Sequence, residues 1–295
     1  MKTFLDCIPC FFRQALETSR MVGAGKKKQK AILDKIAAVL PQFSLQASPP
    51  EMAREINILI SKITGNKDPY REIKKKSNQL ALRIYPDLKS KVFHSNDRLL
   101  TAVELAIAGN IIDYGVKNSL NVSEELKKIL SQEKKAIKKE KKSIFDYAKF
   151  KRTVIKAENI LYLADNAGET VFDRVLIEEI KSMDKSKNII YAVKASPVIN
   201  DALLQDAVFC GIDKLATIIS SGSNAPGTVL SLCTKSFLGL YRKADMVISK
   251  GQGNFEALSG ARRPIFFLFM AKCPVIAEYA NCNLGDIALL YSEVN

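Results

Sequence analysis

Residues that can bind a divalent cation and a phosphate group follow several short apolar segments of this sequence. Asp165 and Asn166 follow one such segment, Asp201 comes after the next, and Lys250 and Lys272 come after two later ones. Carboxylate and amide oxygens are the ligands that hard cations such as Mg²⁺ and Mn²⁺ prefer, and lysine ammonium groups neutralise phosphate oxygens. Together these side chains would support an oxygen-ligated metal ion beside a phosphate.

Glycine-containing loops accompany these side chains. Gly168 precedes Glu169 at the expected start of a helix, residues 221–228 contain Gly-Ser-Asn-Ala-Pro-Gly, and Gly251 opens a Gly-Gln-Gly-Asn loop. Such loops can present backbone N–H groups to an anion. Each feature alone also has a structural explanation, because Asp-Asn pairs form turns and helix caps and glycines serve backbone geometry. The absence from the sequence of a Walker-type loop, and of Gly-x-Gly-x-x-Gly after the first apolar segment, argues against P-loop ATPases and ordinary dinucleotide enzymes.

The apolar segments alternate with helical patterns in the second half of the chain. Their β-branched and aromatic residues indicate strands, and this alternation predicts a parallel sheet with helices on both faces. Ligands of such sheets bind at the carboxyl ends of the strands, so the residues above are expected at one edge. The predicted strands are Asn159–Ala164, Asn188–Val193, Leu215–Ser220, Met246–Ser249 and Ile265–Phe269.

The first half of the chain has helical periodicity instead. Turn signals at 23–25, 48–50 and 65–69 separate its helices, and a further helix is expected after Asp97. We therefore predict an α/β protein with a helical N-terminal domain over 1–150 and an α/β domain over 151–295, which would carry the metal-binding and catalytic residues.

The chain carries 45 Lys and Arg against 31 Asp and Glu, a net charge of +14 that suggests an anionic partner. Many of the lysines lie in Glu124–Lys142, where apolar residues at helical spacing predict a solvated amphipathic helix. This run lacks aromatic residues and arginines, so a nucleic-acid partner is disfavoured and stays only as a third hypothesis.

No apolar run approaches the roughly 18 residues of a membrane span, and the first residues do not resemble a secretory signal. We therefore expect a cytoplasmic protein without a membrane partner. The six cysteines do not suggest a disulfide scaffold. Cys7 and Cys10 form a Cys-x-x-Cys pair that fits structural thiols, half of a metal site or a redox pair. His94 is the only histidine; it is expected on the surface or at a helix start, and Ser-His-Asp catalysis is disfavoured.

In their order along the chain, these motifs resemble the damage-control phosphatases, also called domain of unknown function family 89. The resemblance implies a helical N-terminal part packed on a Rossmann-like α/β/α core. It also implies hydrolysis of small phosphorylated metabolites with Mn²⁺, Co²⁺, Ni²⁺ or Mg²⁺. The matching motifs are Asp165-Asn166-Ala167-Gly168-Glu169, Asn200-Asp201, the segment 250–256 and the segment 109–113, with Cys7-x-x-Cys10 typical of the archaeal and bacterial branch.

The resemblance also implies roles for individual residues. The metal ligands would be Asp165, Asn166 and Asp201, while Lys250 and Lys272 would neutralise the phosphate. The attacking group would be water or, less favourably, Asp165 itself, because a carboxylate that holds a metal ion is a poorer nucleophile. A non-catalytic regulator that binds a small molecule or nucleotide is the alternative function. The residues expected to line the substrate pocket are Asn110, Asp113, Glu169, Gly251 and Asn254.

Overall fold

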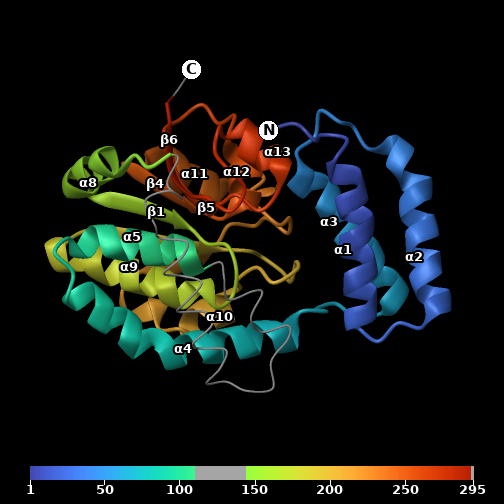
Figure 1. The fold of residues 1–295 in the computed structure, drawn as a ribbon, viewed down its shortest axis with the longest axis horizontal. Coiled ribbons are helices and arrows are strands. Elements are labelled where there is room, and N and C mark those ends of the chain that lie inside the picture. Colours follow the sequence, from blue (N-terminus) through green and yellow to red (C-terminus); the bar gives the residue numbers. More distant parts are fainter. Residues whose placement is uncertain (110–143, 294–295) are drawn as a thin grey trace.

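A six-stranded sheet forms the centre of the computed structural model, which describes residues 1–109 and 144–293 (Figure 1). The strand order is β3-β2-β1-β4-β5-β6; the first five strands are parallel and β6 is antiparallel to β5. The strands are β1 (Asn159–Leu163), β2 (Asn188–Val193), β3 (Thr217–Ser220), β4 (Met246–Lys250), β5 (Ile265–Met270) and β6 (Ile287–Ser292). The five predicted strands are therefore confirmed, whereas β6 was not predicted.

Helices cover both faces of this sheet, as predicted. On one face lie α4 (Arg71–Phe93), α5 (Arg98–Ala108) and α9 (Glu169–Met183), and their buried residues form one apolar core with those of the strands. On the other face lie α11 (Lys235–Lys243), α12 (Gln252–Leu258) and α13 (Pro274–Tyr279). Apart from the first three helices, the remaining elements are α8 (Tyr147–Lys156), α10 (Leu204–Phe209) and the 3₁₀ turns η1 (Leu40–Gln42), η4 (Ile212–Lys214) and η5 (Leu230–Leu232).

The first three helices pack mainly on one another. They are α1 (Cys7–Met21), α2 (Lys26–Val39) and α3 (Pro49–Thr64), and their apolar faces enclose a separate core. Ser48 and Glu51 form a capping box that starts α3, and Gly65 ends it in the left-handed conformation. Helix α3 contacts α12, so this group of helices faces the loops at the carboxyl edge of the sheet (Figure 1).

The helical half is thus divided between two cores, because α4 and α5 belong to the core of the sheet. The lysine-rich run 124–142, and with it the predicted amphipathic helix, lies outside the described residues. Among the helices that are described, none combines the length and the apolar character that a membrane crossing requires.

Candidate active site

The strand order reverses between β1 and β4, and the loops that follow these two strands meet at the carboxyl edge. Asp165 lies in the loop after β1, and Gly251 follows the last residue of β4. Gly251 has a φ of 80°, and a Cβ atom there would overlap the carboxylate of Asp165. Glycine is required here because it allows both the left-handed backbone and the close approach of Asp165.

The chain returns to this point after β2. Asn166 and Asp201 form an isolated antiparallel bridge, and the Ala202 N–H donates to the Asp165 carbonyl oxygen over 2.8 Å. The turn that makes this return includes Ile199, a β-branched residue with φ of 37°, which costs backbone strain of about 1–3 kcal/mol. The three predicted metal ligands, Asp165, Asn166 and Asp201, therefore come together in the fold.

The amide group of Asn166 has a defined orientation. Its Nδ2 atom donates to Asp165 Oδ2 over 2.8 Å and to Glu169 Oε1 over 2.9 Å. Because both hydrogens of the NH₂ group are engaged, Oδ1 is the amide atom that remains to ligate a cation. Glu169 starts α9 and is buried; burial raises its pKa to about 7, Lys250 opposes the rise and Asp165 adds to it.

Three lysines lie around these acids. Lys250 is fully buried, with Nζ 2.6 Å from Asp173 Oδ1 and 3.4 Å from Glu169 Oε2. Burial lowers its pKa, but the charges of Asp173 and Glu169 more than compensate, so the net shift is upward. Lys272 is half-buried, and its positive charge lowers the pKa of Glu169.

Lys194, at the carboxyl end of β2, is a third cation that the sequence analysis did not select. Its side chain is buried, and its Nζ lies 3.4 Å from Asp201 Oδ2. The signal that could have identified it is its position directly after a predicted strand, since a lysine there cannot reach solvent easily and needs an acidic partner.

Four carboxylates (Asp165, Glu169, Asp173 and Asp201) lie among three lysines (Lys194, Lys250 and Lys272) in this region, and burial raises the pKa of one of these carboxylates, Glu169, to about 7. In the described part of the chain, no group of three or more His, Cys, Asp or Glu side chains is arranged to hold a metal ion. The candidate ligand set has two carboxylates and one amide oxygen, a combination of hard oxygen donors that suits Mg²⁺ or Mn²⁺.

Asn254 connects the surrounding loops. Its Nδ2 donates to the carbonyl oxygens of Ala164 and Lys250, and its Oδ1 accepts from the N–H and hydroxyl of Thr228. The side chain is fully buried. A direct contact between Asn254 and a substrate would require one of these bonds to break, so the structure gives this residue the task of fixing three loops.

Asn78 of α4 is a second residue that the sequence analysis did not select. Its Oδ1 accepts the Gly168 N–H over 2.7 Å, and its Nδ2 donates to Asp206 Oδ1 over 2.8 Å. It is buried and attaches α4 to the loop that carries the candidate ligands. Its position in the middle of a helix gave no signal, because its partners are distant in sequence.

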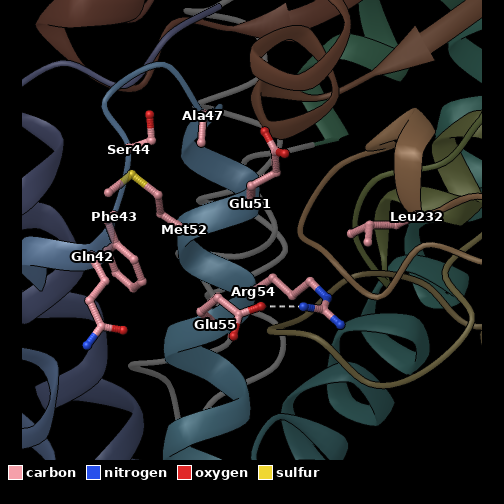
Figure 2. A pocket seen from close by; sticks show the side chains of 9 residues that line it. All are labelled: Gln42, Phe43, Ser44, Ala47, Glu51, Met52, Arg54, Glu55 and Leu232. Carbon is pink, nitrogen blue, oxygen red and sulfur yellow. Dashed lines mark hydrogen bonds and ion pairs between the residues drawn. The ribbon is translucent and has the colours of Figure 1, made fainter. Parts of the chain in front are cut away.

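A cavity of about 260 Å³ lies between the segment 42–55 and Leu232, which follows the loop after β3 (Figure 2). Arg54 of α3 lines it and donates from Nε to Asn224 Oδ1 over 2.5 Å. Leu232 closes the opposite wall. The loop after β3 is therefore held at two points: Thr228 bonds Asn254 at the carboxyl edge, and Asn224 bonds Arg54 of α3.

The other residues singled out in the sequence lie as follows. Asn110 and Asp113 fall outside the described residues. Cys7 and Cys10 lie in the first turn of α1 as free thiols, and burial raises the pKa of both, with smaller contributions from Glu256 and Cys273. His94 is exposed and ends α4, rather than starting a helix.

Glu256 on α12 provides a pH-dependent test of this geometry. Its pKa is raised to about 7, mainly by burial and in smaller part by Asp165, against a hydrogen bond from Gln252. Between pH 4.5 and 7 only the unfolded chain releases this proton, so the contribution of Glu256 to the stability of the wild type falls as the pH rises through this range. The Glu256→Gln variant lacks this loss. Denaturant unfolding of both proteins at pH 5 and pH 8 should show the variant gaining stability relative to wild type, and an unchanged difference would contradict the raised pKa.

The fold and the site define an α/β protein that gathers acids, an amide and lysines where its strand order switches. Residues 3–288 match the family described as the damage-control phosphatase ARMT1-like domain. The chain is 35% identical over 296 residues to a damage-control phosphatase from Pyrococcus horikoshii, covering 99% of both chains. It is 30% identical over 290 residues to a damage-control phosphatase from Archaeoglobus fulgidus, covering 97% of this chain and 98% of that one.

The structure is also similar to the crystal structure of a DUF89 family protein from Pyrococcus horikoshii. The TM-score is 0.90 at 32% identity, and the similarity covers 99% of this chain and 100% of that one. The chain belongs to the damage-control phosphatase family.

Proposed function

We propose that this protein is a metal-dependent phosphatase that hydrolyses phosphomonoesters of small metabolites. The observation that carries the proposal is the meeting of Asp165, Asn166 and Asp201 beside the strand-order switch. Membership of the damage-control phosphatase family, together with similarity over nearly the whole chain to two proteins that carry this name, supports the same reaction.

In this proposal, Asp165, the Oδ1 atom of Asn166 and Asp201 hold a divalent ion: Mn²⁺, Co²⁺, Ni²⁺ or Mg²⁺. Such an ion would polarise the phosphoryl group and lower the pKa of a bound water. Lys272, which is half-buried beside these acids, neutralises phosphate oxygens. Lys250 acts from within the core rather than by direct contact with the phosphate, because its ammonium group already bonds Asp173. Water remains the favoured nucleophile over Asp165.

The alternative, a regulator that binds a small molecule without turnover, has less support because the similar full-length proteins are named phosphatases. A cytoplasmic location remains our expectation.

Phosphate release from 4-nitrophenyl phosphate tests the proposal. Purified protein treated with a chelator should be inactive, and addition of Mn²⁺, Co²⁺, Ni²⁺ or Mg²⁺ should restore activity. A panel of phosphorylated metabolites then identifies the preferred substrate by kcat/KM. A protein that binds phosphorylated compounds in the presence of these metals but releases no phosphate would instead be the non-catalytic regulator.

A further inference from the structure

Asp173 is a buried carboxylate with three hydrogen-bond donors, and the proposed reaction does not use it directly. It lies one turn after Glu169 on α9 and accepts from Tyr162 over 2.7 Å, from Tyr191 over 2.7 Å and from Lys250 over 2.6 Å. The two tyrosines lie opposite each other on β1 and β2, with stacked rings 5.3 Å apart. Asp173 is therefore held rigidly in the core by two strands and the end of a third.

Sheet geometry explains why Lys250 reaches Asp173. Side chains two residues apart on a strand point to the same face, so Lys250 lies on the α9 side of β4, above Ile248. Ile248 pairs with Tyr162, and Tyr162 pairs with Tyr191. The Lys250 side chain thus leaves β4 two residues beyond the row formed by Ile248, Tyr162 and Tyr191. From there its ammonium group reaches Glu169 and Asp173 at the start of α9.

An unbroken series of polar contacts runs from this core carboxylate to the candidate metal ligands. Lys250 bonds Asp173 and approaches Glu169 Oε2 to 3.4 Å. Glu169 Oε1 accepts from Asn166, whose other hydrogen goes to Asp165. We call these five residues, Asp173, Lys250, Glu169, Asn166 and Asp165, the α9 relay.

The α9 relay contains two carboxylates that would repel each other if the lysine between them were absent. Glu169 and Asp173 lie four positions apart on one helix, where like charges repel. Lys250 lies between the two carboxylates and offsets this repulsion. Without the carboxylate charge of Asp173, Glu169 would become the nearest acidic partner of the buried ammonium. A closer approach of Lys250 to Oε2 of Glu169 would shift the same carboxylate's Oε1 atom, which accepts from Asn166.

We propose that Asp173 is a positioning residue for the metal-binding part of the site. Asp173 fixes Lys250, Lys250 fixes Glu169, and Glu169 holds the NH₂ group of Asn166, so that Oδ1 would be the atom left to ligate a cation. Tyr162 and Tyr191 set the position of Asp173. This inference rests on the proposed function, because it concerns the metal ligands named there.

The test compares Asp173→Asn with a matched change on the same helix, Glu178→Gln. Glu178 also accepts from a tyrosine, Tyr85 over 2.6 Å, and is paired with Lys89 and Arg174. It belongs to α9 but makes none of the α9 relay contacts. Both substitutions keep the size of the side chain and remove the charge of a carboxylate that has three polar partners.

The readout is the dissociation constant of Mn²⁺, measured by calorimetry on the metal-free full-length proteins. Groups that orient metal ligands typically account for a 10- to 100-fold change in affinity, so Asp173→Asn should weaken Mn²⁺ binding by about tenfold or more. Glu178→Gln should bind Mn²⁺ as the wild type does, even if its unfolding temperature falls. The Lys250→Met variant should weaken binding too, and its combination with Asp173→Asn should add little, because both residues act through Glu169.

A smaller pair of variants covers the case in which Asp173→Asn does not fold. Tyr191→Phe removes one donor to Asp173, and Tyr85→Phe removes the equivalent donor to Glu178. Only Tyr191→Phe should weaken Mn²⁺ binding. Wild-type affinity in folded Asp173→Asn, or equal affinities of the two tyrosine variants, would overturn the positioning role.

The outcomes for the two proposals can be separated. A wild type that binds Mn²⁺ but releases no phosphate from any tested ester would refute the proposed function and leave the comparison of dissociation constants decisive for Asp173. Normal phosphate release with unchanged Mn²⁺ affinity in Asp173→Asn would refute the role of Asp173 alone. A wild type without Mn²⁺ binding would refute both.

Discussion

Replacement of Asp165 by asparagine is expected to abolish metal-stimulated phosphate release. The substitution keeps the shape of the side chain but removes the negative charge of the carboxylate, which packs against Gly251 and accepts a hydrogen bond from Asn166. A bound metal ion contributes several kcal/mol to transition-state stabilisation, and about 1.4 kcal/mol corresponds to a tenfold change in rate. We therefore expect kcat/KM for 4-nitrophenyl phosphate with Mn²⁺ to fall by about 100-fold or more.

Asp34→Asn provides the control for this experiment. Asp34 is an exposed carboxylate on α2 that pairs with Lys30, and its loss should leave kcat/KM within about twofold of wild type. Full activity of Asp165→Asn under the same conditions would refute the assignment of Asp165 to the metal.

Gly251→Ala is expected to reduce activity by a similar factor, although it removes no functional group. The added Cβ atom would overlap the Asp165 carboxylate, and the backbone at φ 80° and ψ 162° is a conformation that costs a residue with a side chain about 1–3 kcal/mol. Asp165 must then move, and the metal ligands separate. The measured quantities are kcat/KM and the Mn²⁺ dissociation constant.

Two other glycines separate the contributions to this effect. Gly285 also has a positive φ, of 82°, but nothing lies within 4 Å of an added Cβ, so Gly285→Ala should lose stability and keep activity. Gly260 has neither constraint, so Gly260→Ala should be close to wild type in both respects. If Gly251→Ala behaves like Gly285→Ala, the contact between Gly251 and Asp165 has no functional weight.

The strands were predictable because short apolar runs alternated with helical patterns. Strand β6 is also apolar, with the sequence Ile-Ala-Leu-Leu-Tyr-Ser, but it joins the sheet antiparallel to β5, outside the strand–helix alternation on which the other predictions rested. The assignment of α4 and α5 to the core of the sheet was equally inaccessible, because an amphipathic pattern shows that a helix buries one face but does not identify its partner.

Lys250 illustrates the limit for the site. Its residue type and its glycine-rich surroundings predicted a phosphate contact, whereas the structure directs its ammonium group to Asp173 in the core. Asp173 itself gave no signal, since a lone acid on a helix is normally solvated. The buried tyrosines of β1 and β2 were the available indication, because a buried tyrosine hydroxyl needs an acceptor.

The sequence by itself determined the α/β class, five of the strands and the presence of acids, an amide and lysines after the strands. Residue type and the alternation of local patterns are sufficient for these conclusions, because strand direction alone brings the carboxyl ends of parallel strands to one edge. Only the tertiary structure decided which of these residues meet. Asp165 rests on Gly251, Asn166 pairs with Asp201, and Lys250 turns to Asp173. These contacts join residues distant in sequence, and they depend on backbone conformation and burial that no local pattern records.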